Sequence, residues 1–447
     1  MSSSSSDASV REQYERLPYP PRDPEHEKRM LHPTCAEHLD QLNFHCFGGS
    51  QDFKDAFRVL VAGGGTGDAS VFLGEQLRAT DAKITHLDVS GASLLVARER
   101  AAVRGLTNIE FVHGSLLDLR PASSGPFDYI NCSGVLHHLH DPDAGMRALA
   151  SVLKPTGVIG AMVYGLYGRT GVYQMQELMR RVNGVDRSMR EQLENCKSML
   201  ASLPASNWFR RQREELVDLK AGDAGIYDLL LHSRDRAYTV DGVYDLAAAA
   251  GLRIFTFLKL NGGGQVDYNP DRHIKDPCLR ETIASMSVRE RQALAELISG
   301  DEIKHTFYCG RAQVEAPSFA DEAMVPFLSL HFGARGDAHA ALGAMIERQK
   351  KPEVVFDYAG REVRIKRTPN LPALFALIDG TRSIAEIVLA ASSHATTRRE
   401  RLLEEFGSLY VSMKNCDLML LRTRQGHRPT PLVELQRRVV LRYIDRY

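Results

Sequence analysis

Apolar runs alternate with amphipathic segments between residues 51 and 165. Val59–Ala62 and Gly157–Tyr164 are short and almost continuously apolar, as buried strands are. Ala92–Arg104 and Asp143–Leu153 instead carry apolar residues at helical spacing. Strands that alternate with helices predict an α/β domain built on a parallel sheet with right-handed crossovers.

The pattern changes after residue 165, where the chain becomes polar and rich in Met and Arg. Met175–Val182 and Met189–Leu203 are predicted to be helices. A strand at Leu252–Leu258 and a final antiparallel strand at Lys304–Cys309 then complete a sheet of seven strands. The helix Val288–Ile298 is predicted between these two strands, and the domain is expected to extend to about residue 315.

The residues from Pro317 onward form a separate pattern. Two short strands, Glu353–Phe356 and Glu362–Ile365, flank a turn and predict a hairpin. Amphipathic helices and a closing strand are predicted to follow at Pro372–Ile378, Ser383–Ala391, Arg398–Met413 and Leu418–Leu421. This order suggests a small α+β, winged-helix-like domain over residues 317–447, a fold that does not by itself define a ligand.

The most informative motif is the glycine-rich turn that follows the first strand. Gly63, Gly65 and Gly67 alternate, and Asp88 ends the next predicted strand 21 residues after Gly67. Strand, glycine turn, helix, strand and acid is a nucleoside-binding layout in which the carboxylate binds ribose hydroxyls. The dinucleotide fingerprint requires a glycine at the position of Asp68, and an acid there would repel a pyrophosphate at the helix N-terminus. The turn therefore favours a nucleoside ligand without phosphate.

Three further motifs follow the turn at Phe111–Leu119, Phe127–Leu139 and Leu153–Gly160. Together and in this order, the four motifs resemble the class I S-adenosylmethionine-dependent methyltransferases. The resemblance implies a seven-stranded Rossmann-like methyltransferase sheet over residues 51–315, with a helical cap insertion at about residues 166–240. It also implies that S-adenosyl-L-methionine is the cofactor.

The resemblance assigns cofactor contacts to particular positions. The glycines would admit the methionine tail, Asp88 would bind the ribose, and the loop after the third strand would face the adenine. The residues implied to bind the cofactor are Gly63, Gly65, Gly67, Asp88, Val89, Ser115, Leu116 and Ser133. Val61 departs from the family pattern, which often has an acid at that position. Asp68 or backbone carbonyls are then the candidates for holding the cofactor ammonium.

The residues before the sheet are predicted to be a disordered tail followed by an N-terminal lid or arm, together spanning residues 1–50. Tyr14–Pro20 resembles the opening of a bacterial methyltransferase subgroup, in which this segment can lie over the cofactor pocket. Tyr14 and Tyr19 are therefore candidate substrate contacts. The equal alternative is a surface arm whose tyrosines only pack.

His137 is the candidate catalytic residue, as a base or a substrate contact. The competing and favoured interpretation is a histidine at a helix start without a catalytic role. His137 and His138 are adjacent, so on a helix their side chains would point about 100° apart. No second ligand motif lies nearby in the sequence, so no metal site is predicted.

Composition narrows the class of substrate. Lys+Arg and Asp+Glu both number 56, so no global field attracts nucleic acid or an anionic membrane. A small-molecule or protein side-chain acceptor with an N or O nucleophile is therefore favoured over nucleic acid. Seven dispersed cysteines and the lack of a signal peptide or apolar membrane span predict a cytoplasmic protein, and the sequence leaves its oligomeric state undetermined. The alternatives are a catalytically inactive, S-adenosylmethionine-binding regulatory or scaffold protein, which Val61 favours, and an NAD-dependent oxidoreductase, which Asp68 disfavours.

Overall fold

The chain is built around one seven-stranded sheet. The structure is a computed structural model that describes residues 3–212, 216–261, 264–265, 268–329, 338–358, 361–392, 397–430 and 434–435. The strands of this sheet are β1 Arg58–Ala62, β2 Lys83–Asp88, β3 Ile109–His113, β4 Phe127–Ser133, β5 Leu153–Tyr164, β6 Arg253–Phe257 and β9 Lys304–Gly310. Their order is β3-β2-β1-β4-β5-β9-β6, with β9 antiparallel to both neighbours. An antiparallel strand inserted next to the edge confirms the Rossmann-like methyltransferase sheet and differs from the parallel 3-2-1-4-5-6 order of dinucleotide-binding sheets.

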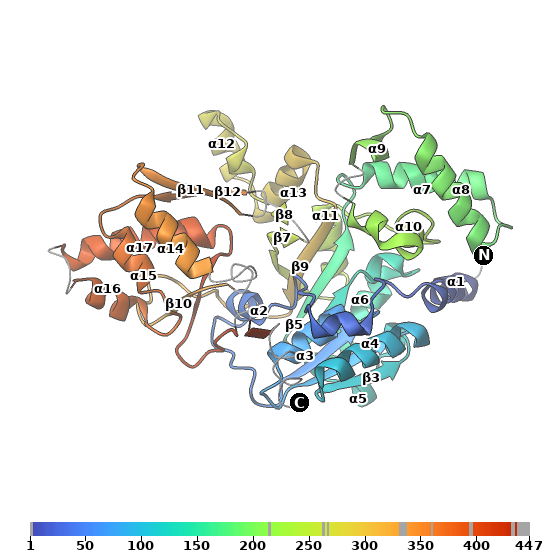
Figure 1. Cartoon of the computed structure of the whole chain (residues 1–447), viewed down its shortest axis with the longest axis horizontal. Coiled ribbons are helices and arrows are strands. Elements are labelled where there is room, and N and C mark those ends of the chain that lie inside the picture. The colour runs from blue at the N-terminus through green and yellow to red at the C-terminus, as the bar shows by residue number, and fades with distance from the viewer. Residues whose placement is uncertain are drawn as a thin grey trace.

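Helices cover both faces of the sheet (Figure 1). On one face, Met146 and Leu149 of α6 (Pro142–Ser151) and Val243 and Leu246 of α11 (Val240–Ala248) share a buried cluster with the strands. On the other face, Leu39 and Leu42 of α2 (Leu39–Cys46) and Leu73 of α3 (Asp68–Gln76) belong to a second cluster. The remaining helices of this domain are α4 Gly91–Arg104, α5 Pro121–Ser124, α12 Pro277–Ala284 and α13 Val288–Ser299. Because β1 to β5 are parallel, their carboxyl ends lie at one edge of the sheet.

A helical unit stands between β5 and α11, as the sequence predicts. It contains α7 Thr170–Asn183, α8 Met189–Ser202, α9 Trp208–Gln212 and α10 Gly222–Leu230. These helices bury their own apolar cluster, which includes Met175, Met179, Cys196 and Phe209. The unit lies beside α1 at the right of Figure 1, and we refer to residues 166–239 as the cap.

The C-terminal residues form an α+β domain whose connections differ from the prediction. The hairpin β11 (Glu353–Tyr358) and β12 (Arg361–Lys366) is present, with α15 Leu371–Ala376, α16 Ile384–Ser392 and α17 Arg399–Lys414. The closing strand β13 (Met419–Arg422) pairs with β10 (Val325–Leu328), an element that the sequence reading missed together with α14 (Ala338–Arg348). Winged-helix-like therefore remains a prediction for this domain.

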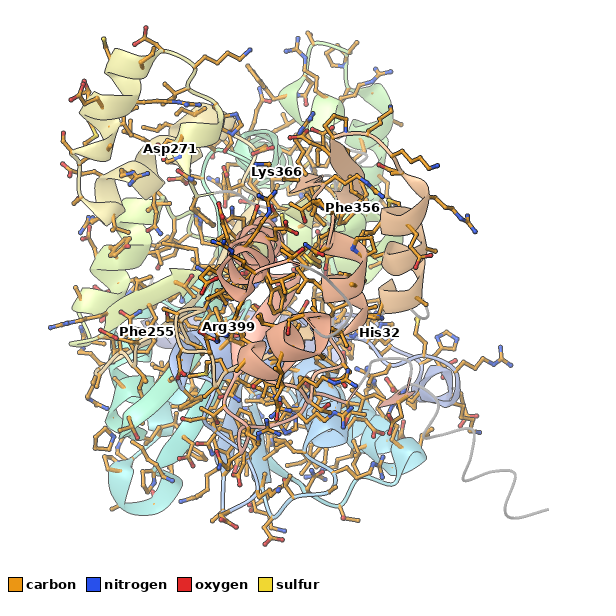
Figure 2. All side chains as sticks on the ribbon, turned by 90° about the vertical axis from the view of Figure 1, so that its left-hand side faces the viewer. His32, Phe255, Asp271, Phe356, Lys366 and Arg399 are labelled. Carbon is orange, nitrogen blue, oxygen red and sulfur yellow. The ribbon has the colours of Figure 1, made fainter. Side chains whose placement is uncertain are left out.

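The C-terminal domain contacts the sheet domain through α2 and the loop that follows it. Phe44 of α2 belongs to the apolar core of the C-terminal domain. Thr423 and His427 donate backbone hydrogen bonds to the carbonyls of Gly49 and Gln51, at 2.9 and 2.8 Å. Figure 2 shows the C-terminal domain in front of the sheet domain, with Phe356 and Lys366 of its hairpin labelled.

The N-terminal segment is more ordered in secondary structure than the sequence suggests. Helix α1 runs over Ser3–Arg16, so the serine-rich start predicted as a disordered tail is helical from Ser3. A 3-10 helix, η1 (Pro24–Lys28), follows and places Glu27 against α4. Among the described residues, no helix has the length and apolar character needed to cross a membrane.

Buried ion pairs attach η1 to the sheet domain. Arg100 of α4 donates to Glu27 at 2.6 and 2.9 Å and to Asp68 at 2.7 Å. Arg104 also pairs with Glu27 and, at 3.4 Å, with Glu75. Glu27 and both arginines are at most 2% exposed. Two buried guanidinium groups thus share one carboxylate from the N-terminal segment.

We predict that Glu27→Ala strongly destabilises the protein, because it leaves Arg100 and Arg104 buried without their shared partner. Removing one partner of a buried pair costs roughly 3–5 kcal/mol. The matched control is Glu25→Ala in the same 3-10 helix, whose pair with Lys28 is exposed and contributes about 0–1 kcal/mol. Urea unfolding of both variants measures the difference, and equal midpoints would contradict the role given to Glu27.

Candidate functional site

A cavity of about 960 Å³ lies at the carboxyl edge of the sheet. The loops after β1, β2, β3 and β4 form its floor, and Met162 and Tyr164 of β5 extend it. Tyr14, Tyr19 and Pro20 of the N-terminal segment and Asp228 of the cap also line it. Ligand sites of open α/β sheets lie at this edge, and here the N-terminal segment and the cap both contribute to its lining.

The glycine turn approaches the cavity with its backbone. Gly63 and Gly65 line the cavity and have φ of +73° and +53°, whereas Gly67, with φ of +99°, caps helix α3 behind them. A Cβ atom on Gly63 would lie 2.4 Å from Val135, and one on Gly65 would lie 2.8 Å from the carbonyl of Tyr19. Only glycine fits this left-handed, closely packed turn.

Asp88 stands at the end of β2, next to the turn. Its carboxylate accepts hydrogen bonds from the backbone N–H groups of Gly65, at 2.7 Å, and Ser90, at 2.8 Å. Burial raises the pKa of Asp88, and these two N–H groups oppose the rise. The carboxylate is therefore fixed in orientation at the cavity wall, with lone pairs left to accept from ligand hydroxyls.

The remaining predicted cofactor residues line the same cavity. Val89, Ser115, Leu116 and Ser133 all contribute to its wall. Ser115 caps the short helix η2 (Leu116–Asp118) by accepting from Leu117 N–H at 3.2 Å, which orients the loop after β3. The structure thus brings together every predicted cofactor residue except Gly67, which supports the turn from behind.

The part of the cavity that the N-terminal segment and the cap line is polar. Tyr14 donates a 2.9 Å hydrogen bond to Asp228 of α10, and Tyr19 donates to Asp218 in the cap. Burial, with a smaller contribution from neighbouring Asp218, raises the pKa of Asp228 to about 7. Burial also raises the pKa of both tyrosines. Tyr14 and Tyr19 therefore lie at the cavity as the lid interpretation expects.

His138 lines the cavity in place of the expected His137. His137 is fully buried beneath the wall, with its ring centroid 4.0 Å from that of Tyr164 and the two rings tilted by 36°, and neither ring nitrogen has a hydrogen-bond partner among the described residues. His138 lines the cavity instead, and its Nδ1 lies 2.7 Å from the carbonyl of Arg234. That contact requires Nδ1–H, so a lone pair remains on Nε2. Burial lowers the pKa of His138, which keeps the ring neutral.

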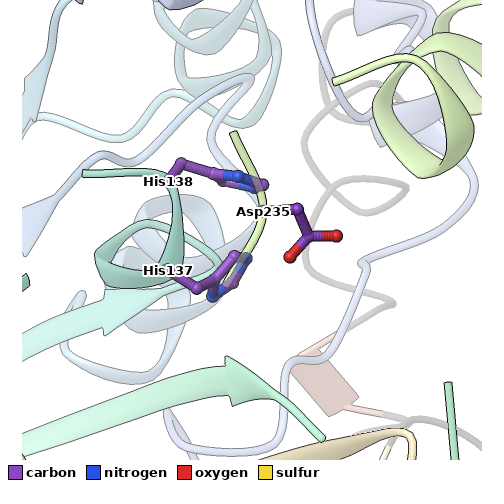
Figure 3. Close-up of side chains that lie close together, drawn as sticks. All are labelled: His137, His138 and Asp235. Carbon is purple, nitrogen blue, oxygen red and sulfur yellow. The ribbon is translucent and has the colours of Figure 1, made fainter. Parts of the chain in front are cut away.

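Two groups of side chains here have the composition of metal ligands. The candidate ligand atoms of His137, His138 and Asp235 all lie within 4.8 Å of one another (Figure 3), as do those of His138, Asp228 and His232. The two adjacent histidines lie in the short 3-10 helix η3 (Leu136–His138), and their ring centroids are only 4.1 Å apart, so the expected divergence of their side chains does not hold here.

Hydrogen bonds account for much of this cluster without an ion. Nδ1 of His232 accepts from the backbone N–H of Arg234 at 3.0 Å, which uses the lone pair that a metal would need. Asp235 accepts from Arg169, at 3.2 Å, and from Gln176, at 2.9 Å. A guanidinium already supplies the positive charge beside Asp235, so the donor set is better suited to hydrogen bonding than to a divalent ion.

The sequence analysis missed Glu37 and Asp228 of the cavity wall and misassigned Asp68. Glu37, which precedes α2, lines the cavity with 1% exposure and accepts from the amide of Asn131. Asp68, which was considered for the cofactor ammonium, is paired with Arg22 at 2.6 Å and with Arg100. Although burial opposes it, the bonds from Arg22 and the charge of Arg100 lower the pKa of Asp68. No local pattern marks Glu37, because its placement depends on contacts distant in sequence.

Comparisons with known proteins identify the class of the central domain. Residues 60–159 match a family model described as a methyltransferase domain. An uncharacterised protein of Synechococcus is 34% identical over 268 residues, which are 59% of this chain and 62% of that protein. The ubiquinone biosynthesis O-methyltransferase of Neisseria meningitidis is 30% identical over 30% of this chain and 52% of its own length. The chain thus spans about three fifths of the first relative and about half of the second.

A solved structure shares the architecture. The structure of PKMT2 from Rickettsia typhi in complex with AdoHcy superposes with a TM-score of 0.61, 13% identity, and coverage of 87% of this chain and 76% of that chain. This likeness confirms the fold. Residues 60–159 therefore match a methyltransferase domain, and the chain has a Rossmann-like fold.

The described residues of the cavity fit S-adenosylmethionine. The cavity offers an oriented carboxylate at Asp88 for hydroxyls, and a glycine turn that a Cβ would fill. Its volume of about 960 Å³ is within the range of small-molecule sites and accommodates a nucleoside with an amino-acid tail.

We predict that Gly65→Ala weakens S-adenosylmethionine binding at least about tenfold, or about 1.4 kcal/mol. The added Cβ would strain a left-handed residue and would lie 2.8 Å from Tyr19 O, displacing the N-terminal segment. Gly251→Ala is the control, because Gly251 has a similar φ of +69° but no atom within 4 Å of the added Cβ. Calorimetry of both variants measures the effect, and equal affinities would contradict the turn's role.

Proposed function

We propose that this protein is an S-adenosylmethionine-dependent methyltransferase that transfers a methyl group to an N or O acceptor on a small molecule or a protein side chain. One observation carries the proposal: one cavity is lined both by the glycine turn with Asp88 and by the polar group around Tyr14 and Asp228. A cofactor end and an acceptor end thus share one enclosure, as transfer between two bound molecules requires.

The residues at the cofactor end of the cavity bind S-adenosylmethionine and orient it. We assign the ribose hydroxyls to Asp88 and the adenine to Ser115 and Leu116. The turn at Gly63 and Gly65 lies closest to the amino-acid tail. When bound, S-adenosylmethionine supplies a methyl carbon activated by a sulfonium, so the protein contributes mainly by positioning, which can supply roughly 7–11 kcal/mol.

The acceptor end supplies a proton acceptor. An acceptor hydroxyl or ammonium must lose a proton as its N or O forms the new bond to carbon and the C–S bond breaks. Asp228 has a raised pKa of about 7, lies in the cavity wall and is oriented by Tyr14. A base with a pKa near the working pH is the most effective. We therefore assign the proton to the carboxylate of Asp228, and His138 Nε2 is a further acceptor in the same wall.

The net charge of the chain and the residues that line the acceptor end indicate the class of acceptor. The chain has no net charge, so no global attraction draws nucleic acid to it. The acceptor end is lined by tyrosines and carboxylates, which suit a group carrying a removable proton. All seven cysteines are free thiols, and we place the protein in the cytoplasm on that basis.

Methyl-labelled S-adenosylmethionine tests the proposal directly. The purified protein is incubated with the labelled cofactor and fractionated bacterial extract, and the label is followed into protein, nucleic acid and small-molecule fractions. Label in the protein or small-molecule fraction supports the proposal. Label confined to nucleic acid contradicts the acceptor class, and binding of cofactor without transfer to any fraction favours the inactive scaffold.

We predict that Asp228→Asn slows transfer to the labelled acceptor by roughly 10²–10⁴-fold, while cofactor affinity stays within about twofold. The wild-type rate should rise with pH through about 7, because Asp228 must be unprotonated to accept a proton, and the variant should lose this rise. Asp223→Asn on the same helix is the control, since Asp223 pairs with Lys197 at the surface. An unchanged rate and pH profile in Asp228→Asn would exclude Asp228 as the base.

A further inference from the structure

Glu37 is a buried carboxylate that the site as described so far does not use. It lies in the segment between η1 and α2, is 1% exposed, and lines the cavity together with Gly63 and Ser133. Among the residues that the structure describes, no basic side chain forms an ion pair with it. Burial raises its pKa to about 7, as expected for a carboxylate that lacks a cation.

The position of Glu37 is fixed relative to the end of β1. Asn131 of β4 donates an amide hydrogen bond to the Glu37 carboxylate and lies 2.9 Å from the hydroxyl of Ser133. Asn131 is also the register partner of Val61. Register partners of parallel strands direct their side chains to the same face of a sheet, so Glu37 reaches the face on which an acid at position 61 would stand.

The backbone around Glu37 is held by three separate elements. The hydroxyls of Tyr129 in β4 and Tyr308 in β9 both donate to the carbonyl of Ala36, at 2.7 and 2.8 Å. The amide of Gln76 in α3 donates to the carbonyl of Glu37 at 2.8 Å, and its oxygen accepts from Leu39 N–H at 3.1 Å. A carboxylate held this way is oriented before any ligand arrives.

The other carboxylates of the cavity are already engaged or distant. Asp68 is neutralised by Arg22 and Arg100. Asp88 is held by backbone N–H groups at the end of β2, and Asp228 accepts from Tyr14 at the acceptor end. Asp118 is exposed in the loop after β3. Of the acids in the described cavity wall, Glu37 is therefore the one that lies on the face of Val61 and is not paired with a cation.

We propose that Glu37 binds the α-ammonium group of S-adenosylmethionine and so takes the place of the acid that the chain lacks at position 61. The inference rests on the proposed function, since it requires the amino-acid tail to lie at the glycine turn. A buried carboxylate that gains an ammonium partner exchanges an unfavourable isolated charge for a charge-assisted hydrogen bond. Specificity for a ligand with an amino-acid tail then resides in a residue outside the strand–turn–helix motif.

The test removes each partner of this contact separately. Calorimetry measures binding of S-adenosylhomocysteine and of its deaminated analogue, S-adenosyl-4-thiobutyric acid, to the wild-type protein and to Glu37→Gln. The wild-type protein should prefer S-adenosylhomocysteine by at least about tenfold. Glu37→Gln should lose most of that preference, and its affinity for the deaminated analogue should stay within about threefold of the wild type.

Controls separate a local effect from a loss of fold. Retained binding of the deaminated analogue shows that Glu37→Gln keeps the cavity intact. If that variant does not fold, Glu37→Asp provides the second test and should show an intermediate preference. Glu25→Gln, an exposed acid of η1, should bind both ligands as the wild type does.

The outcomes distinguish this inference from the proposed function. Wild-type binding of S-adenosylhomocysteine with an unchanged preference in Glu37→Gln overturns the role of Glu37 and leaves the methyltransferase proposal standing. An equal loss of affinity for both ligands also overturns it, because Glu37 would then only support the fold. If neither ligand binds to the wild-type protein, both proposals fail.

Discussion

The attachment of the N-terminal segment to α4 by buried charge is the constraint on which the rest of the site depends. Glu27 pairs with both Arg100 and Arg104, and Arg100 also reaches Asp68 and the carbonyl of Thr66. Buried charges are tolerated only when they are paired, so this helix requires the segment to be in place. The same segment then carries Tyr19 over the glycine turn and Glu37 into the cavity wall.

This network also explains the aspartate at the start of α3. Asp68 complements the positive end of its helix, and Arg22 and Arg100 balance its charge from two distant parts of the chain. A phosphate at the N-terminus of α3 would therefore be repelled by the carboxylate of Asp68. The sequence argument against a dinucleotide therefore reaches the right conclusion, but the aspartate is held by arginines and is not available to a ligand ammonium.

The central sheet and most of the cofactor wall could be predicted because their signals are local. Apolar runs, the alternating glycines and an acid at a fixed distance identify β1, α3 and β2, and each predicted boundary lies within a few residues of the observed one. Tyr14 and Tyr19 were also identified, through a short motif. Glu37 and Asp228 could not be identified, because each reaches the cavity only through contacts between segments distant in sequence.

Two errors have the same physical origin. His137 and His138 are equivalent in sequence, and only the packing of Tyr164 against His137 decides that His138 faces the cavity. In the C-terminal domain, β13 pairs with β10 across almost a hundred residues, and the sequence analysis did not predict β10. Pairings between distant segments cost loop-closure entropy and leave no trace in local periodicity, so neither this sheet partner nor the histidine that lines the cavity could be predicted from the sequence.

The two parts of the N-terminal segment are held by different kinds of interaction. The part from Arg22 to Glu37 is fixed by buried ion pairs and by hydrogen bonds from the side chains of Tyr129, Tyr308 and Gln76 to its backbone. Helix α1, which carries Tyr14, is held partly by Glu15, whose carboxylate accepts from the N–H groups of Gly91 and Ala92 at the start of α4. Glu15 lies nearer the surface, where such contacts are screened by solvent. The stronger attachment therefore holds the part of the segment that carries Glu37, and the weaker one holds the helix that brings Tyr14 to the cavity wall.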